Sequence, residues 1–270
     1  MDKQQFQETV WQFYSAHGRH DLPWRMPEAG GSFDPYKILV SEIMLQQTQV
    51  QRVIPKYRAF LEAFPTVDVL AAAPLSVVLK LWSGLGYNRR AKFLMGAAQQ
   101  IVHEYGGKFP KAQQQLVGLS GVGINTAGAI IAYAYNEPVI FIETNIRTVY
   151  IHHFFADQLQ VDDKAIAAVV AETLDRGNVR EWYWALMDYG SFLKQSVGNT
   201  SRSSKTYVKQ STFAGSSRQL RGAIIRELLD KPRTMPEFQE LLRDDRLPEV
   251  LAALVDEGMV VESQGHFSIT

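Results

Sequence analysis

Apolar residues recur at helical spacing along most of this chain, up to about its last fifty residues. Such amphipathic segments predict α-helices, and the Gly and Pro residues between them mark where each helix ends. The helices predicted in this way cover residues 3–16, 35–46, 50–63, 67–72, 75–82, 89–104, 111–117, 124–135, 144–155, 163–174 and 179–194. The pattern therefore predicts an all-α fold for the greater part of the chain.

The pattern changes near residue 195. Residues 196–217 are rich in Ser, Thr, Gly and Lys, which predicts a basic linker. Residues 218–270 then predict three helices, over 218–229, 235–242 and 247–257, and a short hairpin that turns at Gly265. Three helices and a hairpin are typical of a small winged-helix-like α+β domain.

The amino-acid composition limits which reactive and metal-binding sites the chain can contain. The 270 residues contain no cysteine, which excludes disulfides, a thiolate nucleophile, cysteine-ligated zinc and a cysteine-ligated iron–sulfur cluster. No signal peptide and no apolar run long enough for a membrane span stand out, so we expect a cytoplasmic protein without a membrane partner.

Charge is distributed unevenly. The formal net charge is zero, which taken alone argues against nucleic-acid binding. From Tyr189 to Arg226, however, there is no acidic residue, while seven are basic. This segment predicts either contacts to phosphates or a solvated linker that happens to be basic.

A glycine turn stands between two predicted helices, in LSGVGINTAGAI (Leu119–Ile130). Gly121 and Gly123 allow positive φ and close approach of backbone N–H groups to a ligand. They also precede a helix N-terminus, which favours an anion such as a nucleic-acid phosphate. An ordinary turn between two packed helices explains the same residues.

Two glutamates stand in contrasting positions. Glu42 shares a helix face with Ile38 and Leu39, where burial would raise its pKa and suit it to donate a proton. Glu143 precedes the helix predicted over 144–155, where the helix dipole favours an ionised carboxylate. One acid and one charged stabiliser form a catalytic pair. The alternatives are a Glu42 satisfied by an Arg or a backbone N–H, and a Glu143 that simply caps its helix.

Seven segments together point to a family. They are LPWR (Leu22–Arg25), DPYKILVSEIMLQQTQVQRVIPKY (Asp34–Tyr57), LWSGLGYNRRAKFL (Leu81–Leu94), GGKFP (Gly106–Pro110), LSGVGINTAGAI (Leu119–Ile130), IETNIRTV (Ile142–Val149) and ALMDYG (Ala185–Gly190). In their order and content the chain resembles the helix-hairpin-helix base-excision DNA glycosylases, most closely the MutY adenine glycosylases. The resemblance covers about the first 195 residues.

The resemblance implies a two-lobed helix-hairpin-helix fold for residues 1–195. One lobe, a six-helix barrel, is expected over 31–137, and the other combines 1–30 with 138–195. The expected partner is double-stranded DNA with a mispair or lesion, bound by a monomer in the cytoplasm at the nucleoid. Such enzymes flip the target nucleotide out of the duplex, since its glycosidic bond is unreachable in the stack.

The resemblance also implies residue roles. Glu42 would protonate adenine at N7, and Glu143, beside Asn145, would stabilise positive charge on the sugar. The other implied sites are the base pocket (Trp24, Arg25, Asn125), the residues that probe the base stack (Gln47, Thr48, Leu85, Tyr87), the DNA-binding hairpin (Gly121, Gly123, Ile124, Thr126) and a monovalent cation on backbone carbonyls of Val117, Leu119 and Val122.

Asn125 stands where strand-cleaving relatives carry a nucleophilic lysine, which predicts base removal without strand cleavage. The chain departs from the family in three ways. The segment after the last catalytic helix lacks the four cluster cysteines, so no cofactor is expected beyond the cation. Glu143 replaces an aspartate. Residues 218–270 resemble a winged-helix domain, whereas MutY proteins typically end in a Nudix-like domain.

The interpretation that results is a monofunctional glycosylase that removes adenine opposite 8-oxoguanine or guanine. The alternatives are a mismatch uracil or thymine glycosylase on the same fold and a non-catalytic protein that binds damaged DNA.

Overall fold

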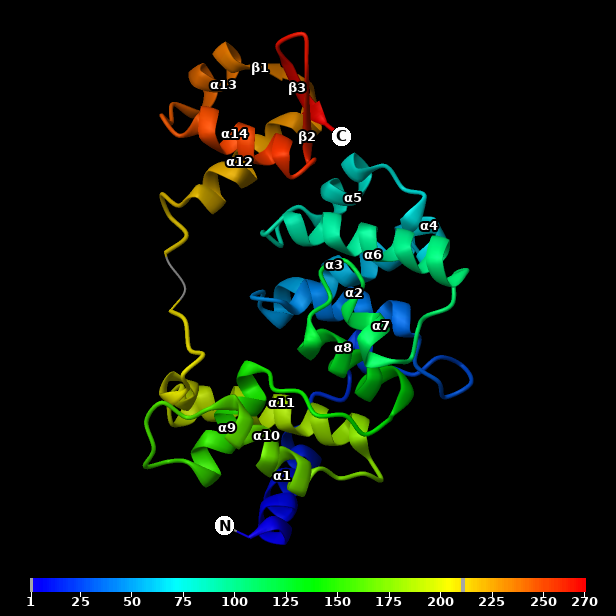
Figure 1. Cartoon of the computed structure of the whole chain (residues 1–270), viewed down its shortest axis with the longest axis vertical. Coiled ribbons are helices and arrows are strands. Elements are labelled where there is room, and N and C mark those ends of the chain that lie inside the picture. The colour runs from blue at the N-terminus through cyan, green and yellow to red at the C-terminus, as the bar shows by residue number, and fades with distance from the viewer. Residues whose placement is uncertain (1, 210–211) are drawn as a thin grey trace. The chain divides into compact units, whose positions relative to one another are not determined.

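The computed structural model describes residues 2–209 and 212–270 (Figure 1). The predicted all-α character is confirmed, and every predicted helix is present with its ends displaced by a few residues at most. The helices are α1 (Lys3–His17), α2 (Pro35–Leu45), α3 (Val50–Ala63), α4 (Val67–Ala71), α5 (Leu75–Trp82), α6 (Arg89–Tyr105), α7 (Gln113–Val117), α8 (Ile124–Ile130), α9 (Thr144–Phe154), α10 (Asp163–Thr173), α11 (Val179–Ser196), α12 (Ser217–Asp230), α13 (Met235–Leu242) and α14 (Leu247–Asp256).

The sequence pattern did not predict several short elements. The helix predicted over 124–135 changes after α8 into a π-helical turn, η2 (Ile131–Tyr135), which stops at Asn136 with φ 56°. Two 3₁₀ turns, η1 (Pro23–Arg25) and η3 (Thr200–Ser203), were not predicted. Each spans about one turn, too short to show an apolar period.

The chain divides into two compact units. Unit 1 comprises Met1–Leu39, Lys111–Gly118 and Val122–Lys209, and unit 2 comprises Val40–Pro110, Leu119–Gly121 and Gln210–Thr270. In unit 1, α1, α9, α10 and α11 pack together. Phe6 lies at their centre, with its ring 5.2 Å from that of Tyr150 and 5.9 Å from that of Trp182. In unit 2, α4 and α5 pack against α6, around the fully buried Trp82.

The C-terminal part of unit 2 has the predicted three helices and hairpin. The hairpin strands β2 (Val260–Ser263) and β3 (His266–Ile269) are joined by a third strand, β1 (Arg233–Thr234), in the antiparallel order β1-β3-β2. The pattern missed β1 because two residues show no alternation. Phe238, fully buried, and Phe267 meet between α13 and the sheet.

The first half of the predicted linker is built into unit 1. The Thr200 hydroxyl donates to the Thr148 carbonyl at 2.9 Å, and Val161 and Ser203 share a backbone hydrogen bond of 2.8 Å. Residues up to about 206 are therefore part of the α9–α10 surface and do not form a free linker. None of the helices within 2–209 and 212–270 is long and apolar enough to cross a membrane.

Candidate active site

Glu143 occupies the N-cap position of α9, with extended backbone (φ −92°, ψ 169°). Within the described chain its side chain makes no capping hydrogen bond, so capping does not explain this residue. Burial raises the pKa of the Glu143 carboxyl, and the neighbouring cations Arg147 and Lys194 oppose that rise. This direction is the opposite of the one expected from the helix N-terminus alone, because burial was not visible in the local sequence.

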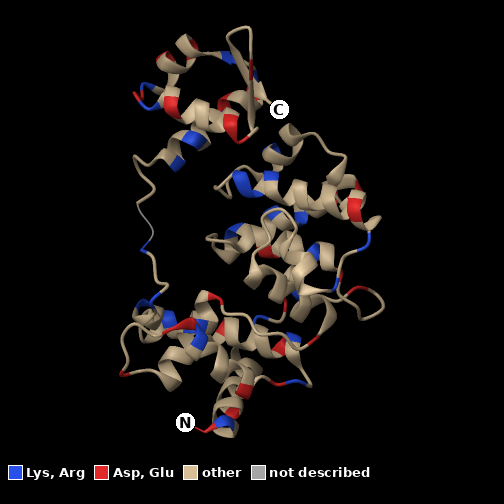
Figure 2. Ribbon diagram, viewed as in Figure 1, with Lys and Arg blue, Asp and Glu red and all other residues tan. Residues whose placement is uncertain are grey.

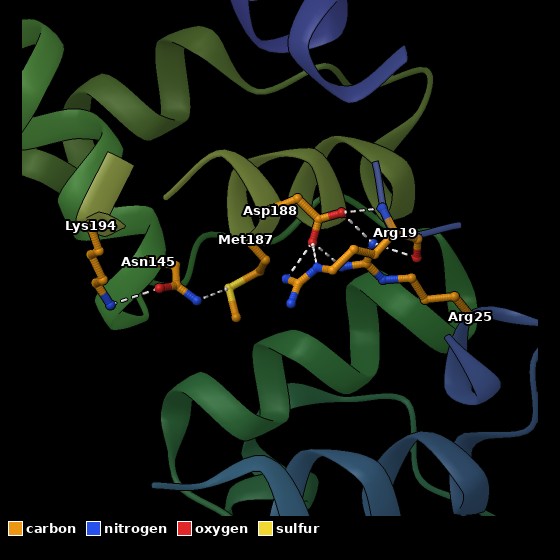
Figure 3. A network of polar contacts seen from close by, with 6 residues as sticks. All are labelled: Arg19, Arg25, Asn145, Met187, Asp188 and Lys194. Atoms are coloured by element: carbon orange, nitrogen blue, oxygen red, sulfur yellow. Dashed lines mark hydrogen bonds and ion pairs between the residues drawn. The ribbon is translucent and has the colours of Figure 1, made fainter. Parts of the chain in front are cut away.

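Asn145 lies two residues further along α9, and Figure 3 shows its amide between two residues of α11. Lys194 Nζ donates to Asn145 Oδ1 at 2.7 Å, and Asn145 Nδ2 lies 3.9 Å from Met187 Sδ. The two helices can approach this closely because α11 carries Gly190. A Cβ on Gly190 would lie 2.2 Å from the Asn145 carbonyl oxygen.

Asn125 is bound to the segment that leads into Glu143. Its Nδ2 donates to the Ile142 carbonyl at 3.0 Å, and its Oδ1 accepts from the Ile142 N–H at 3.2 Å. A side chain with both a donor and an acceptor is needed for this double contact, which an ammonium cannot make. Asn125 therefore connects α8 to the residue before the catalytic candidate.

In the glycine turn, only one of the two positions requires a glycine. Gly121 has φ 74°, and a Cβ there would lie 2.6 Å from Phe93 Cβ. Gly123, the N-cap of α8, has an ordinary φ of −86° and open space around it. Ile124 is 57% exposed, whereas Thr126 is buried.

Glu42 is half-buried on α2, where its neighbours Ile38 and Leu39 are fully buried, as the helical spacing predicted. One buried arginine of α6 secures the end of this helix. Arg90 Nη1 donates to the carbonyls of Ile43, Met44 and Gln46 at 2.7, 3.0 and 2.6 Å. Burial lowers the pKa of Arg90 to about 10, so it stays charged at neutral pH.

The same guanidinium joins the predicted stack-probing residues. Arg90 Nη2 donates to Thr48 Oγ1 at 3.1 Å and to the carbonyls of Leu85 and Gly86 at 3.3 and 3.1 Å. Gln47 and Tyr87 both have left-handed backbone, with φ 54° and 49°. Strained backbone of this kind persists where the surroundings hold it, often at functional sites. Leu85, however, is only 3% exposed and lies in the core of unit 2.

The predicted base-pocket residues Trp24 and Arg25 lie on η1 and are both buried. Arg25 donates to both carboxylate oxygens of Asp188 on α11, at 2.8 and 2.9 Å (Figure 3). Arg19 also donates to this carboxylate, at 2.5–2.8 Å. Burial alone would raise the pKa of Asp188, but the hydrogen bonds and charges of Arg25 and Arg19 hold it below its usual value.

The structure thus groups the predicted residues by unit. Unit 1 brings Glu143, Asn145 and Asn125 together through α9 and Ile142, and unit 2 brings Gln47, Thr48, Leu85 and Tyr87 together around Arg90. Sequence reasoning missed Lys194, Asp188 and Arg90. Asp188 and Arg90 lie inside the motifs ALMDYG and LWSGLGYNRRAKFL, whereas Lys194 stands in the basic run, where nothing distinguishes it from its neighbours. Within the described residues no group of three His, Cys, Asp or Glu side chains could hold a metal ion.

Comparison with known proteins gives one consistent family. Residues 40–172 match the HhH-GPD superfamily of base excision DNA repair proteins. The chain is 34% identical over 192 residues to the adenine DNA glycosylase of Buchnera aphidicola subsp. Baizongia pistaciae, covering 70% of this chain and 52% of that protein. It is 44% identical over 133 residues to that of Mycolicibacterium smegmatis, covering 49% and 44%. The chain spans about half the length of these curated relatives.

Solved structures agree on the fold. The structure of a thermostable thymine-DNA glycosylase aligns with TM-score 0.61 and 26% identity, over 70% of this chain and 86% of that one. Endonuclease III trapped as a covalent DNA intermediate aligns with TM-score 0.58 and 17% identity, over 71% and 87%.

Proposed function

The chain belongs to the HhH-GPD superfamily of base excision DNA repair proteins over residues 40–172, and on this premise we propose that it is a monofunctional DNA glycosylase. It hydrolyses the N-glycosidic bond of adenine mispaired with 8-oxoguanine or guanine. The similarity to adenine DNA glycosylases supports adenine as the base. The main observation in support of this chemistry concerns Glu143, the N-cap residue of α9, whose side chain makes no capping hydrogen bond. Asn145, two residues later, is bound by Lys194.

The proposed enzyme acts as a monomer on double-stranded DNA in the cytoplasm. Its proposed organisation is a glycosylase domain over 1–195, with lobes of 31–137 and of 1–30 plus 138–195. A connecting segment over 196–217 follows, of which residues up to about 206 are built into unit 1, and then a winged-helix-like domain over 218–270.

In the proposed mechanism each carboxylate has its own role. Glu42 donates a proton to adenine N7, which makes the base a better leaving group. As the glycosidic bond breaks, positive charge develops on the sugar, and the ionised Glu143 stabilises it. Water then adds to C1′ and loses a proton, which leaves free adenine and an abasic site.

The product follows from Asn125. Its amide is engaged by Ile142 and cannot attack the sugar, so no imine forms at this position. We expect purified protein to leave an abasic strand that is cut only after alkali treatment. Efficient strand cleavage without alkali, with the protein trapped on DNA by borohydride, would contradict a monofunctional enzyme.

A second candidate is removal of thymine or uracil from a mismatch with guanine. The likeness to a thymine-DNA glycosylase at 26% identity favours it. Glu42 discriminates between the two, because a pyrimidine has no N7 to protonate.

The test is single-turnover base release on duplexes that hold adenine opposite 8-oxoguanine, guanine or thymine, and thymine or uracil opposite guanine. We expect release of adenine opposite 8-oxoguanine or guanine, reduced about 10²–10⁴-fold in Glu42→Gln. The matched control is Glu62→Gln, an exposed glutamate on α3, which should behave as wild type. Unchanged release by Glu42→Gln would overturn the role of Glu42, and binding without release from any duplex would favour a non-catalytic binder.

Glu143 has its own test. Glu143→Gln removes the negative charge and should lower the rate by more than about 10²-fold. Glu143→Asp keeps the charge but withdraws it by about one bond length, so it should retain more activity than Glu143→Gln. Glu172→Gln, exposed on α10, is the control. Full activity in both Glu143 variants would show that the carboxylate has no catalytic role.

A monovalent cation on the backbone carbonyls of Val117, Leu119 and Val122 is also proposed, from the family resemblance. We expect tighter DNA binding in potassium chloride than in choline chloride at equal ionic strength. Equal DNA affinity in the two salts would show that no monovalent cation at this site contributes to binding.

A further inference from the structure

In unit 1 an ammonium binds the amide that lies two residues after Glu143. Glu143 is the N-cap residue of α9, and Lys194 lies near the end of α11. Asn145 accepts a hydrogen bond of 2.7 Å from Lys194 (Figure 3). All three side chains are half-buried. In the described chain neither Glu143 nor Lys194 has an ion-pair partner within 4.0 Å, so neither charge is neutralised by a direct contact.

The other nearby cation is already paired. Arg147, one turn after Glu143, donates to both carboxylate oxygens of Asp163 on α10, each at 2.8 Å. A bidentate pair of this kind fixes the Arg147 guanidinium on Asp163. The element η3, which also packs against α9, contributes only the solvent-exposed Arg202. Arg147 and Lys194 both favour the charged form of Glu143, and of the two only Lys194 has no ion-pair partner among the described residues.

Lys194 is also held in place. Leu193, the residue before it, is buried, and the contact between Gly190 and the Asn145 carbonyl fixes the spacing of α9 and α11. By donating to Oδ1, the Lys194 ammonium orients the Asn145 amide, with Oδ1 toward Lys194 and Nδ2 toward Met187. A lysine on a rigid helix with one defined acceptor gives a fixed positive charge beside the carboxylate.

We propose that Lys194 is a positioning residue of this site, whose ammonium keeps the Glu143 carboxylate ionised and orients the Asn145 amide. The inference rests on the proposed glycosylase function and assigns a role to a residue in the last turn of α11. It also accounts for how a partly buried glutamate remains charged without a direct ion pair.

The consequence is a pH dependence with a definite sign. Burial favours the neutral carboxyl, whereas the charges of Arg147 and Lys194 favour the charged form. Removing the ammonium therefore raises the pKa of Glu143 and lowers its ionised fraction at acidic pH. Because catalysis needs the ionised form, the acidic limb of the rate profile moves to higher pH.

The experiment measures single-turnover base release against pH for wild type, Lys194→Arg, Lys194→Gln and Lys194→Met. We expect the acidic midpoint of Lys194→Met and Lys194→Gln to rise by roughly one pH unit, with about a tenfold reduction in rate below it. Lys194→Arg keeps the charge and should keep the wild-type midpoint. Lys164→Met, an exposed lysine on α10, is the control.

An unchanged midpoint in Lys194→Met overturns the proposal, as does an equal rise in Lys194→Arg. A wild-type midpoint in Lys194→Gln would show that the hydrogen bond acts and the charge does not. Lys194→Gln also preserves the test if Lys194→Met does not fold.

A second readout does not depend on activity. The carboxyl ¹³C resonance of Glu143, assigned by its disappearance in Glu143→Gln, is titrated by NMR in wild type and in the Lys194 variants. A higher midpoint in Lys194→Met supports the proposal even if no duplex is cleaved, in which case only the proposed function fails. Equal midpoints refute the role of Lys194 whatever the activity.

Discussion

Two acidic residues of unit 1 show how neighbours decide the behaviour of a buried carboxylate. Glu143 is desolvated without a direct ion pair, and its pKa is raised. Asp188 is also desolvated, but it accepts hydrogen bonds from Arg25 and Arg19, and its pKa is lowered. The first arrangement leaves a carboxylate available to a ligand, whereas the second uses it to hold η1 against α11.

Asp188→Asn should therefore destabilise the protein, because it leaves the buried Arg25 without its counter-charge. We expect the free energy of unfolding at pH 7, measured by urea denaturation, to fall by about 3–5 kcal/mol. The control Glu28→Gln breaks the partly exposed pair with Lys37 and should cost less than about 1 kcal/mol. Similar destabilisation in the two variants would contradict a structural role for Asp188.

The same pair has a pH signature. A carboxyl whose folded pKa is depressed contributes stability above its unfolded pKa, and that contribution disappears as pH falls through the folded pKa. The difference in stability between wild type and Asp188→Asn should therefore be constant near neutrality and shrink below about pH 4. A difference that stays constant into acid would show that Asp188 is not the titrating group.

At the scale of elements, one side chain of α6 joins two turns that come before this helix in the chain. Arg90 closes the end of α2 and connects the Gln46–Thr48 turn to the Leu85–Gly86 turn. The left-handed residues Gln47 and Tyr87 flank these contacts. The predicted stack-probing residues thus depend on a buried guanidinium that donates to oxygen acceptors in both turns.

Arg90→Met should remove these hydrogen bonds and leave several buried carbonyls without donors. We expect the free energy of unfolding to fall by roughly 1–3 kcal/mol and binding to mispaired duplex to weaken. Arg89→Met is the matched control, since the Arg89 side chain is 57% exposed and lies 4.0 Å from Glu257. If the two variants unfolded at the same urea concentration, Arg90 would not be the organising residue.

At the scale of the whole molecule, a neutral net charge conceals a separation of charge. Lys and Arg dominate the segment from Tyr189 to Arg226, whereas α14 carries Glu249 and Asp256 and no basic residue (Figure 2). A helix with acids and no basic residue is poorly suited to a DNA groove. DNA contacts outside the candidate site are therefore expected from the basic segment and not from α14.

This distribution predicts a salt dependence. Arg202 and Lys209 are exposed, and removing one cation that binds a phosphate lowers the slope of log affinity against log salt by about 0.9. The double variant Arg202→Ala with Lys209→Ala should reduce the slope by roughly two, and Lys164→Ala should leave it unchanged. If plots of log affinity against log salt had the same slope for wild type and the double variant, the basic segment would not be part of the DNA interface.

The positions of the helices followed from the sequence alone, because apolar spacing and Gly or Pro breaks act locally. The family motifs also pointed to Glu42, Glu143 and the glycine turn without any structure. What local pattern could not show was the one-turn η1, the two-residue β1 and the order built into residues 199–206. Each is too short for a period or depends on partners distant in sequence.

The tertiary structure decided the electrostatics. The partners of Asp188 and of the Asn125 amide come from elsewhere in the chain, up to 169 residues away for the pair of Arg19 with Asp188, and the Lys194 charge reaches Glu143 from another helix. A pKa depends on the desolvation and charges that packing brings together, and spacing along one helix does not contain them. The sequence by itself determined which groups are available for chemistry, and packing determined the charge each one holds.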